Sequence, residues 1–313
     1  MISARTSAPH GALAAGIWRI ADPKITLASV ASMIVGAAAA ALAGPIAWRW
    51  LAATVLGIFA IEAAKNASGE IFDWDSGADT GVAEDERSPF SGGKRVIVDG
   101  LLTRRQTAWV ALVAYAIGAA IGLAIAIERE PAVVWLGLLG VALAYFYHAP
   151  PLALAYRGLG ELAVALAYGP VIAAGTYLVQ RHTVDRLVLA PAVPLGLAIG
   201  AFLWVNEFPD ARADAAAGKR TLVVRLGRRR AARAFSWLVA AAYAAVVALP
   251  LLGLPWSTLG GLVGLPLAIR AAARLRRFPE TPAEQIPAQA ATLGSFVAMA
   301  LGLGVGLLAA RWL

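Results

Sequence analysis

The sequence predicts an all-α integral membrane protein, built as a bundle of about nine transmembrane helices. Of its 313 residues, 60% are hydrophobic and the mean hydropathy is +0.70, whereas ordinary soluble domains are about 45–50% apolar. Apolar runs of about 20 residues, the length that spans a bilayer, recur along the chain. The sequence contains no cysteine, which excludes disulfides and zinc–thiolate sites.

The first residues of the chain differ from the rest in being mixed and polar. They include Arg5, Arg19 and Lys24, and we predict a cytoplasmic tail over residues 1–24 with an interfacial helix around Ile17. The apolar run after Lys24 is too long, and too far from the start, for a signal peptide. Residues 25–313 are predicted to form a single transmembrane domain.

Nine apolar segments of roughly membrane-spanning length follow the tail. They are Ile25–Ala43, Ile46–Ala64, Thr107–Ile127, Val133–His148, Gly160–Gln180, Leu187–Phe208, Ala231–Leu251, Ser257–Leu275 and Gln289–Ala309. Glycine and proline mark breaks between them, as at Gly44-Pro45 and Pro150-Pro151. The fourth segment is short for a span.

The distribution of lysine and arginine predicts the orientation. With the N-terminus inside, the outer segments hold only Arg129, Arg181, Arg186 and Arg311, while the cytoplasmic segments hold many more basic residues. The net charge of +8 follows from these loops, and no motif indicates a nucleic-acid partner. An odd number of spans places the C-terminus outside.

Two polar stretches each follow an apolar segment at the predicted cytoplasmic face. Asn206, Asp210 and Asp214 recur every fourth residue, so on a helix all three project from one face. We call these three residues the second array. The first array contains Asn66, Glu70 and Asp73, again on one helical face, and Asp79 just beyond it.

Carboxylates gathered on one face repel one another, and a cation relieves that repulsion. Hard oxygen ligands of this kind suit Mg²⁺, which takes one or two carboxylates and completes its shell with water and substrate phosphate. Basic residues follow each array, as phosphate binding requires; they are Lys94 and Arg95, and then Lys219, Arg220 and Arg225. Two arrays facing one another could therefore clamp a diphosphate between Mg²⁺ ions.

The two stretches resemble the UbiA-type superfamily of membrane prenyltransferases, which carries two aspartate-rich motifs. The segment NEFPDARADAAAGKRTLVVRLG is similar to the second motif of the 1,4-dihydroxy-2-naphthoate polyprenyltransferase branch. NASGEIFDWDSGAD, followed by SPFSGGKRVIVDGLLTRRQ, is similar to the first. Glu70 stands where many members have Asp, and its longer side chain can still ligate Mg²⁺.

The resemblance implies transfer of an isoprenoid chain from an allylic polyprenyl diphosphate to an aromatic acceptor in menaquinone or related quinone biosynthesis. It implies helices around a central cavity that opens to the cytoplasmic side of a prokaryotic inner membrane. Both arrays would bind Mg²⁺, with Asn66, Asp73, Asn206 and Asp210 as the catalytic members. The five basic residues would bind the diphosphate, and the isoprenoid tail would lie in a groove open to membrane lipid.

Two other functions remain open from the sequence. The same scaffold also serves terpene cyclases and prenyltransferases with lipid or porphyrin acceptors. A transporter with acidic ion sites is the non-enzymatic alternative, although transporters place such charges near the bilayer midplane.

Several residues near the arrays have two interpretations. Pro209 either kinks a helix or marks its end. Trp74 and Trp204 are either interfacial anchors or aromatic faces toward a cationic intermediate. Glu161 would pair with Arg157 or contact the acceptor. His148 is expected to be interfacial.

Overall fold

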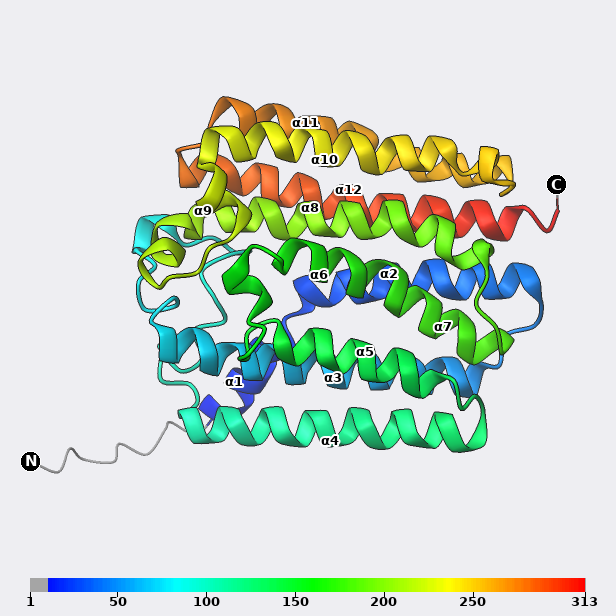
Figure 1. The fold of residues 1–313 in the computed structure, drawn as a ribbon, viewed down its shortest axis with the longest axis horizontal. Coiled ribbons are helices and arrows are strands. Elements are labelled where there is room, and N and C mark those ends of the chain that lie inside the picture. Colours follow the sequence, from blue (N-terminus) through cyan, green and yellow to red (C-terminus); the bar gives the residue numbers. More distant parts are fainter. Residues whose placement is uncertain (1–10, 313) are drawn as a thin grey trace, which may run out of the picture.

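The structure is a computed structural model, and it describes residues 11–312. Within this range the chain is helical, without β-strands, and its helices run side by side along one long axis (Figure 1). The α-helices are α1 (Ala12–Ala21), α2 (Pro23–Ala43), α3 (Trp48–Ser76), α4 (Arg104–Glu128), α5 (Val133–Phe146), α6 (Gly160–Leu166), α7 (Ile172–Arg181), α8 (Arg186–Ala216), α9 (Leu222–Leu226), α10 (Arg228–Ala248), α11 (Leu265–Arg277) and α12 (Pro282–Ala309).

Shorter 3₁₀ segments and one π segment complete the chain. The 3₁₀ segments are η1 (Glu84–Glu86), η2 (Leu154–Arg157), η4 (Pro250–Leu252) and η5 (Trp256–Gly264). The π segment η3 (Ala167–Val171) joins α6 to α7 and contains Pro170. A π turn inside a helix is rare and often marks a functional position.

The helical segments coincide with the predicted spans, which confirms the predicted all-α membrane bundle. Eight of them are long and apolar enough to cross a membrane, namely Ala12–Ala43, Trp48–Ser76, Arg104–Glu128, Gly160–Arg181, Arg186–Ala216, Arg228–Ala248, Trp256–Arg277 and Pro282–Ala309. The fourth predicted span corresponds to α5, which has 14 residues. Because about 20 residues are needed to span, a ninth crossing through α5 stays a prediction.

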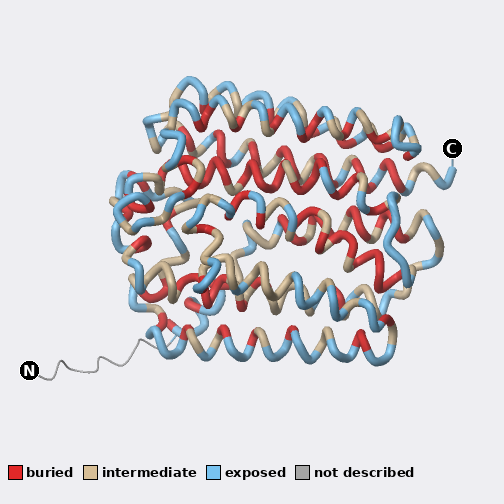
Figure 2. Tube along the Cα trace, in the orientation of Figure 1, coloured by how far each residue is buried: buried red, intermediate tan, exposed pale blue. Residues whose placement is uncertain are grey.

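The largest cluster of buried apolar residues lies mainly in the C-terminal half, where α8 packs against α10 and α12. Phe208, Phe235 and Phe296 are fully buried there. Figure 2 shows buried residues concentrated along these helices, whereas α4 and α5 are mostly exposed or half-buried. The looser side of the bundle, around α3, α4 and α5, leaves room for a cavity.

The helices that carry the two arrays extend past the predicted ends of their spans. Helix α3 continues beyond Ala64 to Ser76, and α8 continues through Pro209 to Ala216. Pro209 therefore lies inside a helix, and the alternative that it marks the helix end is wrong. The Arg228 guanidinium donates hydrogen bonds to the carbonyls of Phe208 at 3.0 Å and Pro209 at 3.4 Å, which stabilises α8 at this position.

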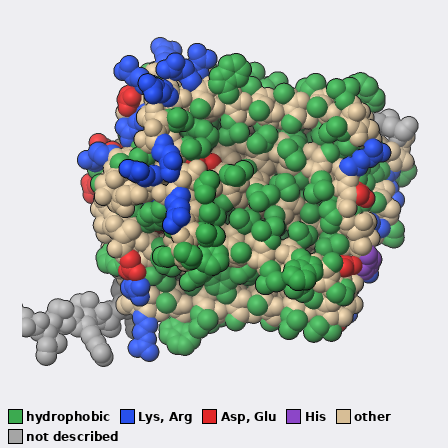
Figure 3. Space-filling view, in the orientation of Figure 1, with side chains coloured by type: hydrophobic (Ala, Val, Ile, Leu, Met, Phe, Trp, Pro, Cys, Tyr) green, Lys and Arg blue, Asp and Glu red, His purple; other side chains and the backbone are tan. Residues whose placement is uncertain are grey.

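Both arrays lie at the same end of the bundle. The left end of the bundle in Figure 1 contains the loop between α3 and α4, helix α9 and helix α1. The C-terminal end of α12 lies at the right. Basic side chains gather at this left end and an apolar surface separates it from the other end (Figure 3). Trp48, Trp135 and Trp237 are among the large apolar side chains exposed on the surface, as expected where helices meet lipid.

The tail predicted over residues 1–24 includes a helix that packs on the bundle. Helix α1 contains Ile17, in agreement with the expected helix there, and Ile20 is buried against α3. The boundary between the predicted tail and the transmembrane domain stays a prediction, and residues 1–10 lie outside the described part of the chain.

Candidate functional site

One large cavity lies between the looser helices and contains both arrays. Its volume is about 1390 Å³, above the roughly 300–1,000 Å³ of common small-molecule pockets. Charged residues line the end beside the arrays, and apolar residues such as Val134, Gly175 and Val179 line the opposite end. A cavity of this kind suits a ligand with an anionic head and a long apolar tail.

Asp73 has the most complete set of partners in the first array. Its carboxylate accepts hydrogen bonds from the Tyr156 hydroxyl at 2.8 Å and from Lys219 Nζ at 3.4 Å, and His148 Nε2 lies 3.5 Å away. Tyr156 and His148 come from the connection between α5 and α6, and Lys219 comes from the connection between α8 and α9. Asp73 therefore ties the end of α3 to the loops that follow α5 and α8.

The other members of the first array lie around the same end of the cavity. Glu70 accepts a hydrogen bond from the Ile97 amide at 3.2 Å, and the Asn66 amide nitrogen donates to the Ile20 carbonyl at 2.9 Å. Asp79 is buried, and its Oδ2 has no hydrogen-bond partner among the described residues. Burial, together with the charges of Asp73 and Glu70, raises the pKa of Asp79 to about 9.

Gly93 determines how closely the loop approaches Asp79. It has a φ of +74°, and a Cβ on it would lie 2.1 Å from Asp79 Oδ1. Glycine is therefore required there both by backbone conformation and by space. The run SPFSGGKR forms a loop that covers the first array.

The second array lies on α8 and faces the same cavity. Asp210 Oδ2 accepts a hydrogen bond from the Gly92 amide at 3.0 Å, whereas its Oδ1 has no partner in the described range. Asn206 Oδ1 is likewise buried and without a partner there. Asp214 Oδ1 lies 3.7 Å from Lys219 Nζ, so Lys219 joins Asp214 of this array to Asp73 of the first.

Lys219 is the link between the two arrays. Burial alone would lower the pKa of Lys219, but the carboxylates of Asp73 and Asp214 outweigh burial and raise it. Lys219 therefore stays charged at neutral pH. Its ammonium lies between a carboxylate of the first array and a carboxylate of the second.

The donor atoms in this site fit Mg²⁺. Asp79 Oδ2, Asn206 Oδ1 and Asp210 Oδ1 are buried oxygens that line the cavity without a hydrogen-bond partner in residues 11–312. The described side chains form no ready-made cluster of three or more metal-ligating groups. Mg²⁺ usually binds through one or two carboxylates plus water and substrate phosphate, so a preformed cluster is not required.

The five predicted phosphate-binding residues divide into two groups. Lys94, Arg95 and Lys219 line the cavity, where Lys94 pairs with Asp22 and Arg95 donates to the Asp79 carbonyl at 2.8 Å.

Arg220 and Arg225 lie outside the cavity lining. Arg220 has an exposed side chain, and the Arg225 guanidinium donates to the carbonyls of Arg157 at 2.7 Å and Arg220 at 3.0 Å. Lys219 and Thr221, on either side of Arg220, line the cavity, so nearness in sequence to the second array does not by itself bring these two side chains into it.

One expectation about a single residue is wrong, and one of the two alternatives for another residue is excluded. His148 is not interfacial; its side chain is 12% exposed and lies beside Asp73. A Cβ on Gly69 would lie 2.5 Å from His148 Cε1, so the missing side chain on α3 makes room for this ring. Glu161 does not pair with Arg157; it accepts a hydrogen bond from the Leu222 amide at 2.8 Å and holds the start of α9.

The aromatic side chains that line the cavity include two tyrosines as well as Trp18, Phe90 and Phe202. Tyr147 and Tyr168 line it, whereas Trp74 and Trp204 do not. Trp204 is buried in the helical core, so it is neither an interfacial anchor nor a wall of the cavity. From the sequence, Tyr156 is, like Tyr145, Tyr147 and Tyr168, either an interfacial anchor or an aromatic face toward a cation. Its contact with Asp73, which joins residues 83 positions apart, could not be predicted.

Comparison with known proteins gives consistent matches over most of the chain. Residues 29–293 match the model of the UbiA prenyltransferase family. A 1,4-dihydroxy-2-naphthoate octaprenyltransferase of Mycobacterium tuberculosis is 34% identical over 257 residues, covering 82% of this chain and 84% of that protein. A 2-carboxy-1,4-naphthoquinone phytyltransferase of Synechocystis is 29% identical and covers 85% of this chain and 84% of its own length.

Solved structures share the fold at low sequence identity. A UbiA homologue from Archaeoglobus fulgidus superposes with a TM-score of 0.62 at 17% identity, covering 94% of this chain and 99% of that one. A UbiA homologue from Aeropyrum pernix K1 superposes with a TM-score of 0.61 at 18% identity, covering 96% and 98%.

Proposed function

Because the chain belongs to the UbiA prenyltransferase family, we propose that it transfers an isoprenoid chain from an allylic polyprenyl diphosphate to an aromatic acceptor in menaquinone or related quinone biosynthesis. The observation that carries the proposal is the meeting of both arrays, joined by Lys219, at the polar end of one long cavity. The similarity to enzymes named for naphthoate and naphthoquinone acceptors supports an acceptor of that class.

The arrays supply the groups that hold the diphosphate end of the donor. Bound Mg²⁺ would neutralise charge as the diphosphate leaves. The ligands would come from Asn66, Glu70, Asp73, Asp79, Asn206, Asp210 and Asp214. Lys94, Arg95 and Lys219 line the same end and would bind phosphate oxygens directly.

The remainder of the cavity provides the surroundings that an allylic cation needs. Its apolar walls accommodate the isoprenoid tail and exclude water, which would otherwise capture the cation. The rings of Tyr147 and Tyr168 line the path between the arrays and the apolar end, where aromatic faces stabilise positive charge. The aromatic acceptor would attack the cation there and then lose a proton.

We expect purified protein to release diphosphate from an allylic diphosphate only when Mg²⁺ and an aromatic acceptor are both present. Mg²⁺ should support turnover better than Ca²⁺, because its small octahedral shell matches diphosphate oxygens, and excess EDTA should abolish it. The measurement is diphosphate release together with mass spectrometry of the product. Release without an acceptor and with a cyclic hydrocarbon product would indicate a cyclase, and turnover in EDTA would contradict the metal requirement.

We also propose that the site faces the cytoplasm of a prokaryotic cell, with the N-terminus inside. The concentration of basic residues at the end that contains the arrays supports this orientation (Figure 3). A reporter enzyme that is active only outside the membrane should be silent when fused after Gly218, in the loop between α8 and α9. The matched fusion after His182, in the loop between α7 and α8 at the other end, should be active, and the reverse pattern would invert the topology.

A further inference from the structure

A second polar group lines the cavity outside the two arrays. It consists of Ser29 on α2, Glu62 and Lys65 on α3, and Tyr168 in the π segment η3. Glu62 accepts hydrogen bonds from the Ser29 hydroxyl at 2.7 Å and from the Tyr168 hydroxyl at 3.2 Å. We call these four residues the inner polar cluster. The proposed binding of Mg²⁺ and diphosphate uses none of them.

Lys65 has more hydrogen-bonding capacity than its surroundings satisfy. Its Nζ donates to the Tyr168 hydroxyl at 3.1 Å, and no other hydrogen bond and no ion pair of this Nζ is found in residues 11–312. An ammonium carries three donors, and a charge in an apolar interior is costly unless it is paired. Lys65 is therefore poised to bind an anion that enters the cavity.

The other cavity lysines are engaged or exposed. Lys94 pairs with Asp22, and Lys219 lies between Asp73 and Asp214. Lys24 is exposed and donates to the Pro89 carbonyl. Lys65 is thus the partly buried cavity lysine that has no carboxylate within 4.0 Å in the described part of the chain.

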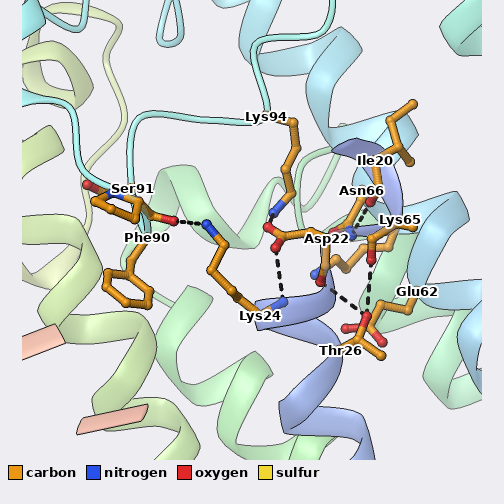
Figure 4. A network of polar contacts seen from close by, with 12 residues as sticks. Ile20, Asp22, Lys24, Thr26, Glu62, Lys65, Asn66, Phe90, Ser91 and Lys94 are labelled. Atoms are coloured by element: carbon orange, nitrogen blue, oxygen red, sulfur yellow. Dashed lines mark hydrogen bonds and ion pairs between the residues drawn. The ribbon is translucent and has the colours of Figure 1, made fainter. Parts of the chain in front are cut away.

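The side chain of Lys65 is directed away from Asp73 of the first array, although Asn66 of that array is the next residue in the chain. Lys65 precedes Asp73 by eight residues on α3, which corresponds to about 12 Å along the helix. Side chains on a helix tilt toward its N-terminus. Lys65 follows that direction, because it contacts Tyr168, and Tyr168 also contacts Glu62, which precedes Lys65 on α3. Figure 4 shows Lys65 beside Glu62 and Asn66 along α3, near the start of α2.

We propose that Lys65, positioned by the Tyr168 hydroxyl, binds an acidic oxygen of the aromatic acceptor, a carboxylate or a phenolate, and thereby selects and orients that acceptor. This inference rests on the proposed function. A charge-assisted hydrogen bond from Lys65 would hold the acidic group. The Tyr168 hydroxyl accepts one hydrogen bond from Lys65 and donates its single proton to Glu62. Glu62 also accepts from Ser29, so Tyr168 positions the ammonium of Lys65. The diphosphate is the other source of acidic oxygen, and the experiment distinguishes the two.

The first arm measures binding without turnover. 1,4-Dihydroxy-2-naphthoate and 1,4-dihydroxynaphthalene, which lacks the carboxylate, are titrated calorimetrically under anaerobic conditions into wild type, Lys65→Met and Lys65→Arg, with no donor and no metal. Wild type should bind the acid about tenfold more tightly than its neutral analogue. Lys65→Met should abolish that preference, and Lys65→Arg should keep most of it. Equal binding of both compounds by wild type, or an unchanged preference in Lys65→Met, would overturn the inference.

The second arm separates acceptor from diphosphate. In steady-state assays Lys65→Met should raise the acceptor KM about tenfold and leave the donor KM unchanged, while Lys24→Met, the matched control, should change neither. A change in the donor KM alone would assign Lys65 to the diphosphate and overturn the inference. The wild type could also bind the acid preferentially through Lys65 and yet transfer no prenyl group. That result would overturn the proposed function and leave this subsite standing. Thermal unfolding of each variant checks that the fold is kept.

Discussion

Replacing either Asp73 or Asp210 with asparagine is expected to lower turnover about a hundredfold, equivalent to about 2.7 kcal/mol in the barrier. Each substitution removes one negative charge from a site whose proposed role is to hold Mg²⁺ against a leaving diphosphate, and losses of this size follow the removal of a single charge-stabilising group. Asparagine keeps an oxygen that can accept the hydrogen bond from Tyr156 or from the Gly92 amide. The fold should therefore be retained, which thermal unfolding will check.

The double mutant tests whether the two arrays act together. If Asp73 and Asp210 served separate sites, the two losses would multiply to about ten-thousandfold. Because Lys219 lies between Asp73 and Asp214, we expect one site, and residues that act as a unit are far from additive. The double mutant should then lose little more than either single mutant, and a fully multiplicative loss would contradict a shared diphosphate.

Asp75 offers a matched control on the same helix. Its carboxylate is two residues from Asp73, but it is 43% exposed and forms an ion pair with Arg104 at 2.7 Å. Asp75→Asn removes a charge near the site without touching the cavity. Its turnover should stay within about twofold of wild type, since an exposed ion pair contributes about 0–1 kcal/mol. A large loss here would mean that any charge near this end matters, and would weaken the case for the arrays.

The sequence predicted the parts of the site that depend on helical spacing. Asn206, Asp210 and Asp214 lie on one helix, and all three line the cavity, because a spacing of four residues fixes one face whatever the neighbouring helices do. Apolar length likewise predicted the helices themselves, because a bilayer requires a run of about 20 residues.

Contacts between helices could not be predicted in the same way. Apolar runs specify neither tilt nor neighbours, so nothing in the sequence placed His148 beside Asp73 or Tyr168 beside Lys65. The same limit explains Arg225, which follows the second array closely in sequence but lies outside the cavity, held by backbone carbonyls. Lys65, in contrast, is in the sequence one of the many basic residues at the cytoplasmic ends of apolar runs, and such a lysine commonly indicates only the orientation of the chain.

The apolar end of the cavity should set the length of isoprenoid chain that the protein accepts. Gly175 of α7 lines this end of the cavity. A Cβ added to Gly175 would have no neighbouring heavy atom within 4 Å among the described residues. Gly175 follows Tyr168 by seven residues, about 10 Å along the helix, so it lies beyond the inner polar cluster. A phenylalanine side chain would fit there only by filling space that we assign to the tail.

Gly175→Phe is therefore expected to discriminate against long donors. Overfilling a packed space costs about 1–3 kcal/mol, so kcat/KM for geranylgeranyl diphosphate should fall tenfold or more relative to geranyl diphosphate, whose shorter tail ends before the obstruction. Leu139→Phe on α5 is the control, because Leu139 is exposed and does not line the cavity; its ratio should match wild type. An equal loss for both donors in Gly175→Phe, with thermal stability unchanged, would mean that the tail takes another path out of the site.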